Sequence, residues 1–409
     1  MPYDSILNWI SFTNPMDNPF YAYGDVYNLP YDIGYKLWEL IGGTLAWLLN
    51  LIFPNNGVSS FLMSDAVMNA LAIVLMVVVI FSAAFIINLT MIWQERKVLG
   101  RMMDRRATRI GPLGYLQNLA DGLKTFLKEN IMPAKADKMG YMWALSIVIG
   151  SSVLIACMIP LSDRWFIVDY GTGLLIIFAL FAIAPFTILV AGWAQNNKYS
   201  LIGGMRAAAQ LISYEVPMLI VFASVALMAG SFNINEIVHA QAETMWYIFP
   251  LLLGFIVFMV AAIAEAERIP FDLPEAEAEL VEGWQTEYSG MKWGLIMLGD
   301  YFRGYVACAL GAIMFLGGWM IPGIGPGPVP ELVFLLKVFL LFFIFIWVRA
   351  AHCRVRTDQI LNIGWKVLLP LSMINLIIVI LIKMTGDMPW DMVIGLIPWD
   401  SIREVIPWQ

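Results

Sequence analysis

Long apolar runs recur along this chain of 409 residues, and polar connections of varied length separate them. A helix that crosses a lipid bilayer needs roughly 20 mainly apolar residues. Eight segments meet this requirement, at about 66–93, 139–161, 171–194, 206–230, 245–264, 292–321, 332–351 and 365–384. The runs are too long and too continuous for the strands of a membrane barrel. The pattern therefore predicts an all-α polytopic membrane protein with about eight transmembrane helices, over residues 66–384.

The composition agrees with this class. Sixty per cent of the residues are hydrophobic and only 13 % are charged, which excludes an ordinary soluble domain of this length. The 16 Trp and 15 Tyr fit aromatic belts at the membrane interfaces. The 25 Met are scattered through the apolar runs as flexible filler rather than grouped as metal ligands.

The basic residues are distributed unevenly between the connections, and this asymmetry predicts the topology. The connection at 94–138 carries ten Lys and Arg, whereas the next one has only Arg164. Lys198 and Arg206 mark the third connection, and Arg354 and Arg356 follow the seventh predicted span. Loops rich in Lys and Arg stay in the cytoplasm. We therefore expect the main polar loops to be cytoplasmic, in the plasma (inner) membrane of a prokaryote, with both ends of the eight-helix unit facing outward.

The two flanks fit the pattern less well. In the N-terminal extension, residues 1–65, the stretch 33–53 is apolar, but Lys36 and Glu39 interrupt it and Gly42–Gly43 weakens it as a helix. This favours an interfacial or lipid-edge helix over a ninth span. No secretory signal is evident, and residues 385–409 form a C-terminal tail.

Few residues of the chain are suited to hold a metal or a redox group. Cys157, Cys308 and Cys353 form no CxxC pair, and His239 and His352 lie far apart in sequence. These spacings argue against a disulfide, a zinc site, an iron–sulfur cluster or haem ligation. If the protein belongs to a redox machine, a partner handles the electrons.

The first basic connection has structure of its own. After Gly111–Pro112, apolar residues recur at helical spacing and charged residues take the other face, which predicts an amphipathic helix at the membrane surface. The apolar positions are Leu116, Leu119, Leu123, Phe126 and Leu127. Most of the basic residues need no role beyond setting topology and contacting lipid phosphates. Glu95 and Asp121 are different, because acids in this basic stretch suggest paired charges at a docking surface or a cavity mouth.

Glu215 lies about ten residues inside an apolar run. An ionised carboxylate at the centre of a membrane helix costs about 2.5–3.5 kcal/mol or more. The side chain is therefore expected to be protonated, to pair with a cation such as Arg206, or to face water. Alternation between the first two is what a proton relay requires. The alternative is a structural hydrogen bond to a neighbouring helix, and Tyr214 could share either role.

The segment 265–287 holds eight acidic residues and one basic residue, Arg268. A solvated acidic loop is the usual explanation of such a run, but apolar residues are interleaved with the acids here. A helix that begins near Pro274 would place Glu275, Glu279 and Glu282 on one face. Like charges in a partly buried cluster raise the pKa of some members toward neutrality, so that protons can be held and passed on.

Four motifs in this order carry a resemblance over roughly residues 66–384: ERKVLGR, LQNLADGLKTFLKE, SYE and PFDLPEAEAELVEG. The chain resembles the H-subunit family of NADH-quinone oxidoreductase (respiratory complex I), which is the family of its quinone-site membrane subunit. One departure is visible, since the turn at 106–112 is one residue shorter than the family usually has. The family also commonly has Glu at the position of Asp300.

The resemblance implies roles for three sets of residues. Quinone-chamber residues would be Glu95, Arg96, Lys97, Arg101, Arg109, Arg268 and Phe271. Proton-pathway or coupling residues would be Glu215, Asp272, Glu275, Glu277, Glu279, Glu287 and Asp300. Residues for docking of other subunits would be Asp121, Lys124, Lys128 and Glu129. No residue would transfer electrons and none would bind a metal.

By this resemblance the protein forms the quinone-binding chamber of a proton-pumping complex I-type oxidoreductase and couples quinone reduction to proton translocation. A quinone would be its substrate, and iron–sulfur clusters and flavin would reside only in partner subunits. Its partners would be peripheral quinone-reducing and iron–sulfur subunits, antiporter-like membrane subunits and lipids, and no nucleic acid. The electron donor and the quinone stay open, so a ferredoxin- or deazaflavin-dependent complex or a membrane-bound hydrogenase is an alternative. A stand-alone ion transporter is a further one, but it should show an inverted repeat, and none is found.

Other charged residues in the later part of the chain have simpler readings. Asp300 and Arg303 are spaced to pair at i, i+3. Lys337 either snorkels or joins a polar file. Arg349, Arg354 and Arg356 are read as topology anchors and docking charges.

Overall fold

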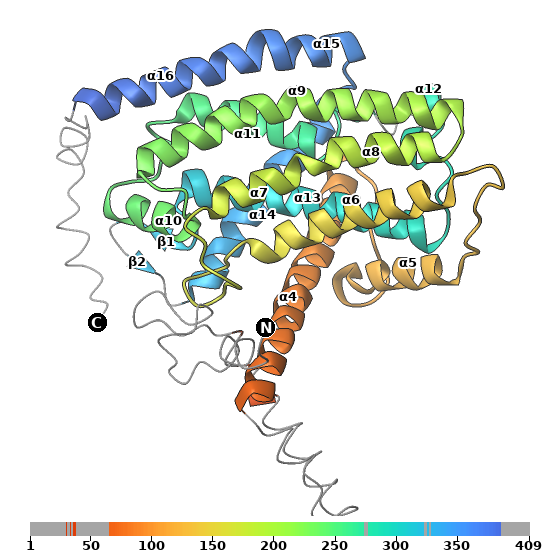
Figure 1. Ribbon diagram of the computed structural model, residues 1–409, viewed down its shortest axis with the longest axis horizontal. Helices are drawn as coiled ribbons and strands as arrows, with labels where there is room; N and C mark the ends of the chain where they lie inside the picture. Colours follow the sequence, from red (N-terminus) through yellow and green to blue (C-terminus); the bar gives the residue numbers. More distant parts are fainter. Residues whose placement is uncertain are drawn as a thin grey trace, which may run out of the picture. The chain divides into compact units, whose positions relative to one another are not determined.

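The computed structural model describes residues 65–273, 277–322, 325–326 and 329–385, together with Pro30, Ile33, Lys36 and Leu37. Helices dominate this part of the chain (Figure 1), which confirms the predicted all-α class. Seven of the described helical segments are long and apolar enough to cross a membrane, and Leu252–Glu265 is a shorter apolar helix. These eight match the eight predicted segments. Most of the predicted helix at 33–53, and the tail after Thr385, lie outside the described residues.

The elements follow one another with few strands between them. The first half of the described chain contains α4 (Asp65–Met102), α5 (Leu116–Leu127), α6 (Lys138–Met158), α7 (Gly173–Phe181), α8 (Ile183–Ala194) and α9 (Lys198–Ala229). The second half contains α10 (Ile234–Glu243), α11 (Leu252–Glu265), α12 (Glu277–Leu280), α13 (Met291–Leu316), β1 (Met320–Ile321), β2 (Gly325–Pro326), α14 (Pro330–Ala351), α15 (Thr357–Asn362) and α16 (Leu369–Thr385). Two antiparallel residue pairs join β1 to β2. A π-helical turn, Ile363–Leu368, connects α15 to α16.

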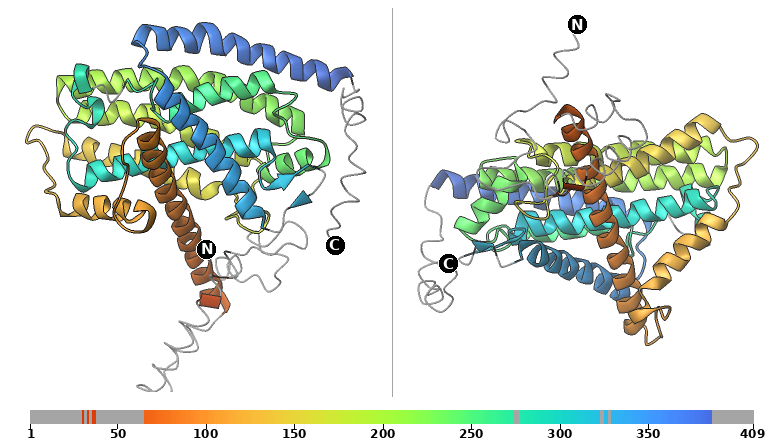
Figure 2. Two further views of the ribbon diagram at one scale, coloured as in Figure 1. Left: turned by 180° about the vertical axis from the view of Figure 1, so that it is seen from behind. Right: turned by 90° about the horizontal axis from the view of Figure 1, so that it is seen from below.

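The described residues divide into two compact units: the first contains 65–87 with Cys157–Tyr170, and the second contains 88–156 with the described residues from 171 to 385. Within the second unit, α9 lies between α8, α11 and α16 and contacts all three. Helix α13 contacts both α11 and α14. Figure 2 shows α14 crossing the other helices of this unit obliquely. Helix α9 carries Glu215.

Prolines explain where the helices depart from the predicted segments. The span predicted at 171–194 is split into α7 and α8 at Ala182. Pro185 has no N–H to donate to Phe181, and its ring crowds that carbonyl. Pro370 has the same relation to Lys366, and a π-helical turn replaces the regular ladder there. Helix α11 begins later than the predicted 245, because Pro250 disfavours helical backbone at the residue before it.

Two glycines end helices by adopting left-handed backbone. Helix α9 ends at Gly230 (φ 80°), the predicted residue, but it begins at Lys198 rather than near Arg206. Asn197 caps its first turn by accepting a hydrogen bond from the Tyr199 N–H at 3.1 Å. Helix α13 ends at Gly317 (φ 68°), short of the predicted residue 321.

Candidate functional site

A pocket of about 550 Å³ opens beside the carboxyl-terminal part of α4. The residues that line it are Glu95, Arg96, Leu99, Arg105, Arg106, Ala107, Thr108, Arg109, Gln117, Tyr301 and Arg349. Five of them are arginines and one is a carboxylate, so the walls are strongly positive. The pocket draws its walls from the first connection and from α4, α5, α13 and α14. Three of the residues predicted for the quinone chamber, Glu95, Arg96 and Arg109, are among them.

At the inner side of this pocket a single buried carboxylate contacts two arginines. The Glu95 side chain is 5 % exposed and forms an ion pair with Arg349. Its Oε1 also lies 3.6 Å from Nη1 of Arg268. The Arg268 guanidinium stands over the ring of Tyr301, 4.3 Å from the centroid. We name Glu95, Arg268, Tyr301 and Arg349 the pocket-side cluster.

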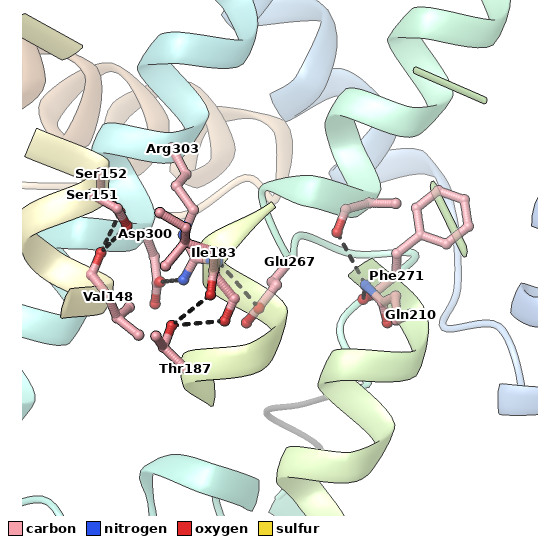
Figure 3. Close-up of polar contacts among 12 residues, drawn as sticks. Val148, Ser151, Ser152, Ile183, Thr187, Gln210, Glu267, Phe271, Asp300 and Arg303 are labelled. Carbon is pink, nitrogen blue, oxygen red and sulfur yellow. Dashed lines mark hydrogen bonds and ion pairs between the residues drawn. The ribbon is translucent and has the colours of Figure 1, made fainter. Parts of the chain in front are cut away.

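A second group of charged side chains is buried among α9, α11 and α13. Nη2 of Arg303 donates to Oδ1 of Asp300 at 2.7 Å, which confirms the predicted i, i+3 pair. Nη1 of Arg303 lies 3.6 Å from Oε1 of Glu267 (Figure 3). Glu265 and Glu215 lie close enough to interact electrostatically with each other and with Arg303. We name Glu215, Glu265, Glu267, Asp300 and Arg303 the buried-acid cluster.

The two clusters are connected through the chain itself. Glu267 and Arg268 are neighbours in the connection after α11, and Asp300 and Tyr301 are neighbours in α13. Arg268 is also near enough to act on the charge of Asp300. The two clusters thus share adjacent residues at two places and one electrostatic interaction.

The remaining part of the predicted acidic segment is held by other polar groups. Asp272 accepts a hydrogen bond from Arg354 at 3.0 Å. Burial raises the pKa of Asp272, and the hydrogen bond and charge of Arg354 only partly oppose this. Glu287 accepts a hydrogen bond from the Asn197 amide at 2.8 Å. These contacts fix the segment at both its ends.

The predicted helix in this segment is wrong in one respect. Helix α12 ends at Leu280, and Val281 then takes positive φ (66°), so Glu282 does not continue the helical face of Glu279. Glu275 and the side chain of Glu277 lie outside the described residues.

The suggested pairing of Glu215 with Arg206 is also wrong. Nη1 of Arg206 instead donates to Oε2 of Glu279 at 2.7 Å. Glu215 is 7 % exposed, and the cation that acts on it is Arg303.

The other predicted chamber residues lie apart from the lining of this pocket. Lys97 donates to the backbone carbonyls of Leu113 at 3.0 Å and Thr108 at 3.4 Å, so it holds the fold of the first connection. Arg101 is exposed. Phe271 is buried against Tyr214, with ring centroids 5.2 Å apart.

The predicted docking residues lie on α5 or just after it. Asp121 forms an ion pair with Arg96, which is a lining residue of the pocket. Lys124, Lys128 and Glu129 are exposed. The predicted amphipathic helix is present as α5, and its apolar residues are exposed, Leu127 to 88 %.

Several site residues were missed or misread from sequence. Arg349, read as a topology anchor, is a partner of Glu95. Lys337 does not snorkel, because it is buried and its ammonium donates to the carbonyls of Leu316, Gly318 and Met320, each at 2.7 Å. Glu267 and Arg303 were given no role in a site. The available signal was opposite charges placed in or beside apolar helices, where each needs a partner.

Within the residues that the structure describes, no group of three or more His, Cys, Asp or Glu side chains could hold a metal ion. The three cysteines are unpaired thiols.

Comparison with known proteins identifies the family. The family described as NADH dehydrogenase matches residues 73–380. The NADH-quinone oxidoreductase H subunit of Paramagnetospirillum magneticum is 42 % identical over 320 residues, which cover 78 % of this chain and 94 % of that protein. The NADH-quinone oxidoreductase H subunit of Bacillus thuringiensis is 46 % identical over 298 residues, covering 71 % of this chain and 87 % of that protein.

The chain belongs to the H-subunit family of NADH-quinone oxidoreductase. The matched range contains every residue of the pocket-side and buried-acid clusters. For a member of this family, other complex I subunits are partners. The family assignment and the seven apolar helices together make this an integral membrane protein.

Proposed function

We propose that this member of the H-subunit family forms the quinone chamber of a proton-pumping complex I-type oxidoreductase and couples quinone reduction to proton translocation. One observation supports this most directly. A pocket with charged walls adjoins a buried carboxylate, Glu95, and adjacent residues connect that carboxylate's partners to four acids inside the helix bundle.

The chemistry of quinone reduction gives this arrangement its purpose. Reduction adds two electrons and requires two protons, so negative charge appears in the chamber before protons arrive. Arg268 and Arg349 are placed to respond to that charge, because both already share Glu95. When their attraction is divided between Glu95 and a reduced quinone, the field at Asp300 and Glu267 changes. Acids that gain and lose protons in response would pass the change onward, through Glu215, to antiporter-like subunits.

In this proposal the protein transfers no electrons. Peripheral subunits that hold iron–sulfur clusters and flavin roof the chamber, and the basic first connection faces them from the cytoplasmic side of a prokaryotic plasma membrane. Helix α5 lies on the membrane surface with Leu123, Phe126 and Leu127 in lipid, which accounts for their exposure of 65 %, 65 % and 88 %. The names of the relatives favour NADH as donor. If the donor were a ferredoxin or a deazaflavin, or if the complex were a hydrogenase, the electrons would pass through different partner subunits.

Arg268→Gln in the complete complex tests the chamber. The substitution removes the cation shared by Glu95 and Tyr301, so we expect quinone reduction and proton translocation in proteoliposomes to fall together by at least about tenfold, the loss that 1.4 kcal/mol produces. Electron transfer from the donor to a water-soluble acceptor should persist, since that path avoids the chamber. Arg164→Gln, at an exposed arginine in another connection, is the matched control.

The same preparation identifies the partners. Purification of the tagged chain in mild detergent should recover iron–sulfur subunits and bound quinone. Full quinone reduction by the Arg268→Gln complex would contradict the proposal. So would recovery of the chain alone in a form that transports ions, and a nickel-hydrogenase partner would favour the hydrogenase alternative.

A further inference from the structure

The buried-acid cluster contains four carboxyl groups and one arginine. Arg303 is 2 % exposed, and the side chains of its two ion-pair partners, Glu267 and Asp300, are 3 % and 7 % exposed. Glu265 is 1 % exposed and Glu215 is 7 % exposed. If all four acids were ionised, the cluster would carry a net charge of minus three in a region from which solvent is nearly excluded.

Hydrogen bonds from Arg303 and Gln285 stabilise such a charge at Asp300, but several other carboxyl oxygens of the cluster have no donor among the described residues. Neither carboxyl oxygen of Glu265 has a hydrogen-bond partner among the described residues, and the same holds for Oε1 of Glu215 and Oδ2 of Asp300. An ionised carboxylate that is buried without donors is very costly, and such a group binds a proton instead. The arginine keeps its charge under all accessible conditions. The cluster is thus most stable near zero net charge, with one carboxylate ionised and three protons held by the others.

We infer that Arg303 is a positioning residue that keeps one proton-accepting carboxylate open in the buried-acid cluster. Asp300 is the member it holds ionised, because their hydrogen bond at 2.7 Å is shorter than the 3.6 Å contact with Glu267. Glu215, Glu265 and Glu267 hold the three protons. A proton that reaches Asp300 is matched by release of one proton from another member, so that the net charge is restored. The positive charge of Arg268 also acts on Asp300. Arg268 is already in contact with Glu95, so it does not replace Arg303.

The inference rests on the proposed coupling function, in which these acids exchange protons. It adds a claim about Arg303 that coupling alone does not require. Without the cation, the neutral form of the cluster has all four acids protonated. No member can then accept a proton, and exchange stops although every acid is still present.

Two substitutions in the complete complex distinguish the effect of the positive charge of Arg303 from the effect of its side-chain shape. Arg303→Gln removes the charge, and Arg303→Lys keeps it. We expect Arg303→Gln to lower proton translocation by at least tenfold and to gain one proton, seen as an added protonated-carboxyl band in the infrared spectrum. Arg303→Lys keeps the charge, so it should retain most translocation and the parental infrared spectrum. Arg164→Gln controls for general effects of replacing an arginine, and equal subunit content shows that the variants assemble.

The outcomes separate the two proposals. Translocation by Arg303→Gln at the parental rate, or loss of translocation without an added carboxyl band, would overturn the role of Arg303. Equal loss in Arg303→Lys and Arg303→Gln would assign it a shape-dependent structural role instead. If the parent complex itself translocates no protons, the coupling function fails. The infrared comparison of parent and Arg303→Gln still tests the charge claim in that case. If Arg303→Gln does not assemble, Arg303→Lys decides whether the charge of Arg303 is what matters. Loss of translocation in Arg303→Lys would by itself contradict the proposed role of Arg303.

Discussion

Gly203 is the point at which helix α9 touches the end of the acidic segment. A Cβ atom at this position would lie 2.5 Å from Cα of Gly283, 2.7 Å from its carbonyl carbon and 2.8 Å from the backbone nitrogen of Trp284. All three are backbone atoms, so no side-chain rotation can relieve the contact. Gly283 itself has positive φ (55°), and Trp284 beyond it is fully buried.

Gly203→Ala should therefore weaken the docking of the acidic segment. Carbon atoms in contact lie about 3.5–4.0 Å apart, so the backbone has to move by about 1 Å. Overpacking of this kind costs typically about 1–3 kcal/mol, and Ala in place of Gly within a helix returns roughly 0.5–1 kcal/mol. A net loss of about 1–2 kcal/mol lowers the ratio of docked to undocked segment by about 5–30-fold.

Hydrogen exchange measured by mass spectrometry over residues 283–290 reports this ratio directly. The variant should exchange faster there than the parent, while α14 exchanges as before. Gly150→Ala is the matched control, because Gly150 lies in α6 with no heavy atom within 4 Å of the added Cβ. Its exchange and its thermal stability should stay at the parental level or improve slightly. Unchanged exchange at 283–290 in Gly203→Ala would refute the view that this backbone contact docks the segment.

Two further predictions concern residues at other places in the fold. Lys337→Met leaves buried carbonyls at the end of α13 without their donor, which costs about 1–3 kcal/mol for an unsatisfied group; the melting temperature of the purified complex should fall, and by less in Lys337→Arg. Arg354→Gln removes the hydrogen bond and charge that oppose the effect of burial on Asp272, so the pKa of Asp272 should rise further above its ordinary value. A carboxyl group with a raised pKa in the fold stabilises it below the unfolded-state pKa, and that contribution is lost as the pH rises through the folded-state pKa. Arg354→Gln should thus lose more thermal stability than the parent between acidic and neutral pH, and a stability difference that is independent of pH would contradict this assignment.

The spans could be predicted from sequence because their signal is local. Twenty apolar residues in a row have few other stable arrangements, and the end of α9 at Gly230 follows from the left-handed backbone that glycine allows. The beginning of α9 was missed, because the polar residues at its start resemble a loop. The split at Ala182 and the π-helical turn were missed as well, although Pro185 and Pro370 were the available signals.

The pairing of charges could not be predicted, because it depends on contacts between distant parts of the chain. Glu95 and Arg349 are separated by 254 positions, and Arg206 and Glu279 by 73. The sequence shows that a charged group near the membrane needs a partner, but it does not show which of many. Glu215 illustrates the ambiguity: Arg206 is nearer in sequence, yet the helix packing turns Arg206 toward Glu279 and leaves Arg303 to act on Glu215.

The ratio of acids to bases differs between the two clusters. This difference determines which cluster favours negative charge and which favours bound protons. The pocket-side cluster has one carboxylate, Glu95, for two arginines, whereas the buried-acid cluster has four carboxyl groups for one. Excess positive charge beside the pocket favours an anion there, and a deficit of positive charge inside favours bound protons. In the proposed function, negative charge that arises on the quinone and a proton bound by the buried acids would thus be stabilised at neighbouring places. Arg268 acts on both, since it contacts Glu95 and influences Asp300. In the proposed coupling function, Arg268 is therefore one residue through which chemistry in the pocket reaches the interior of the bundle.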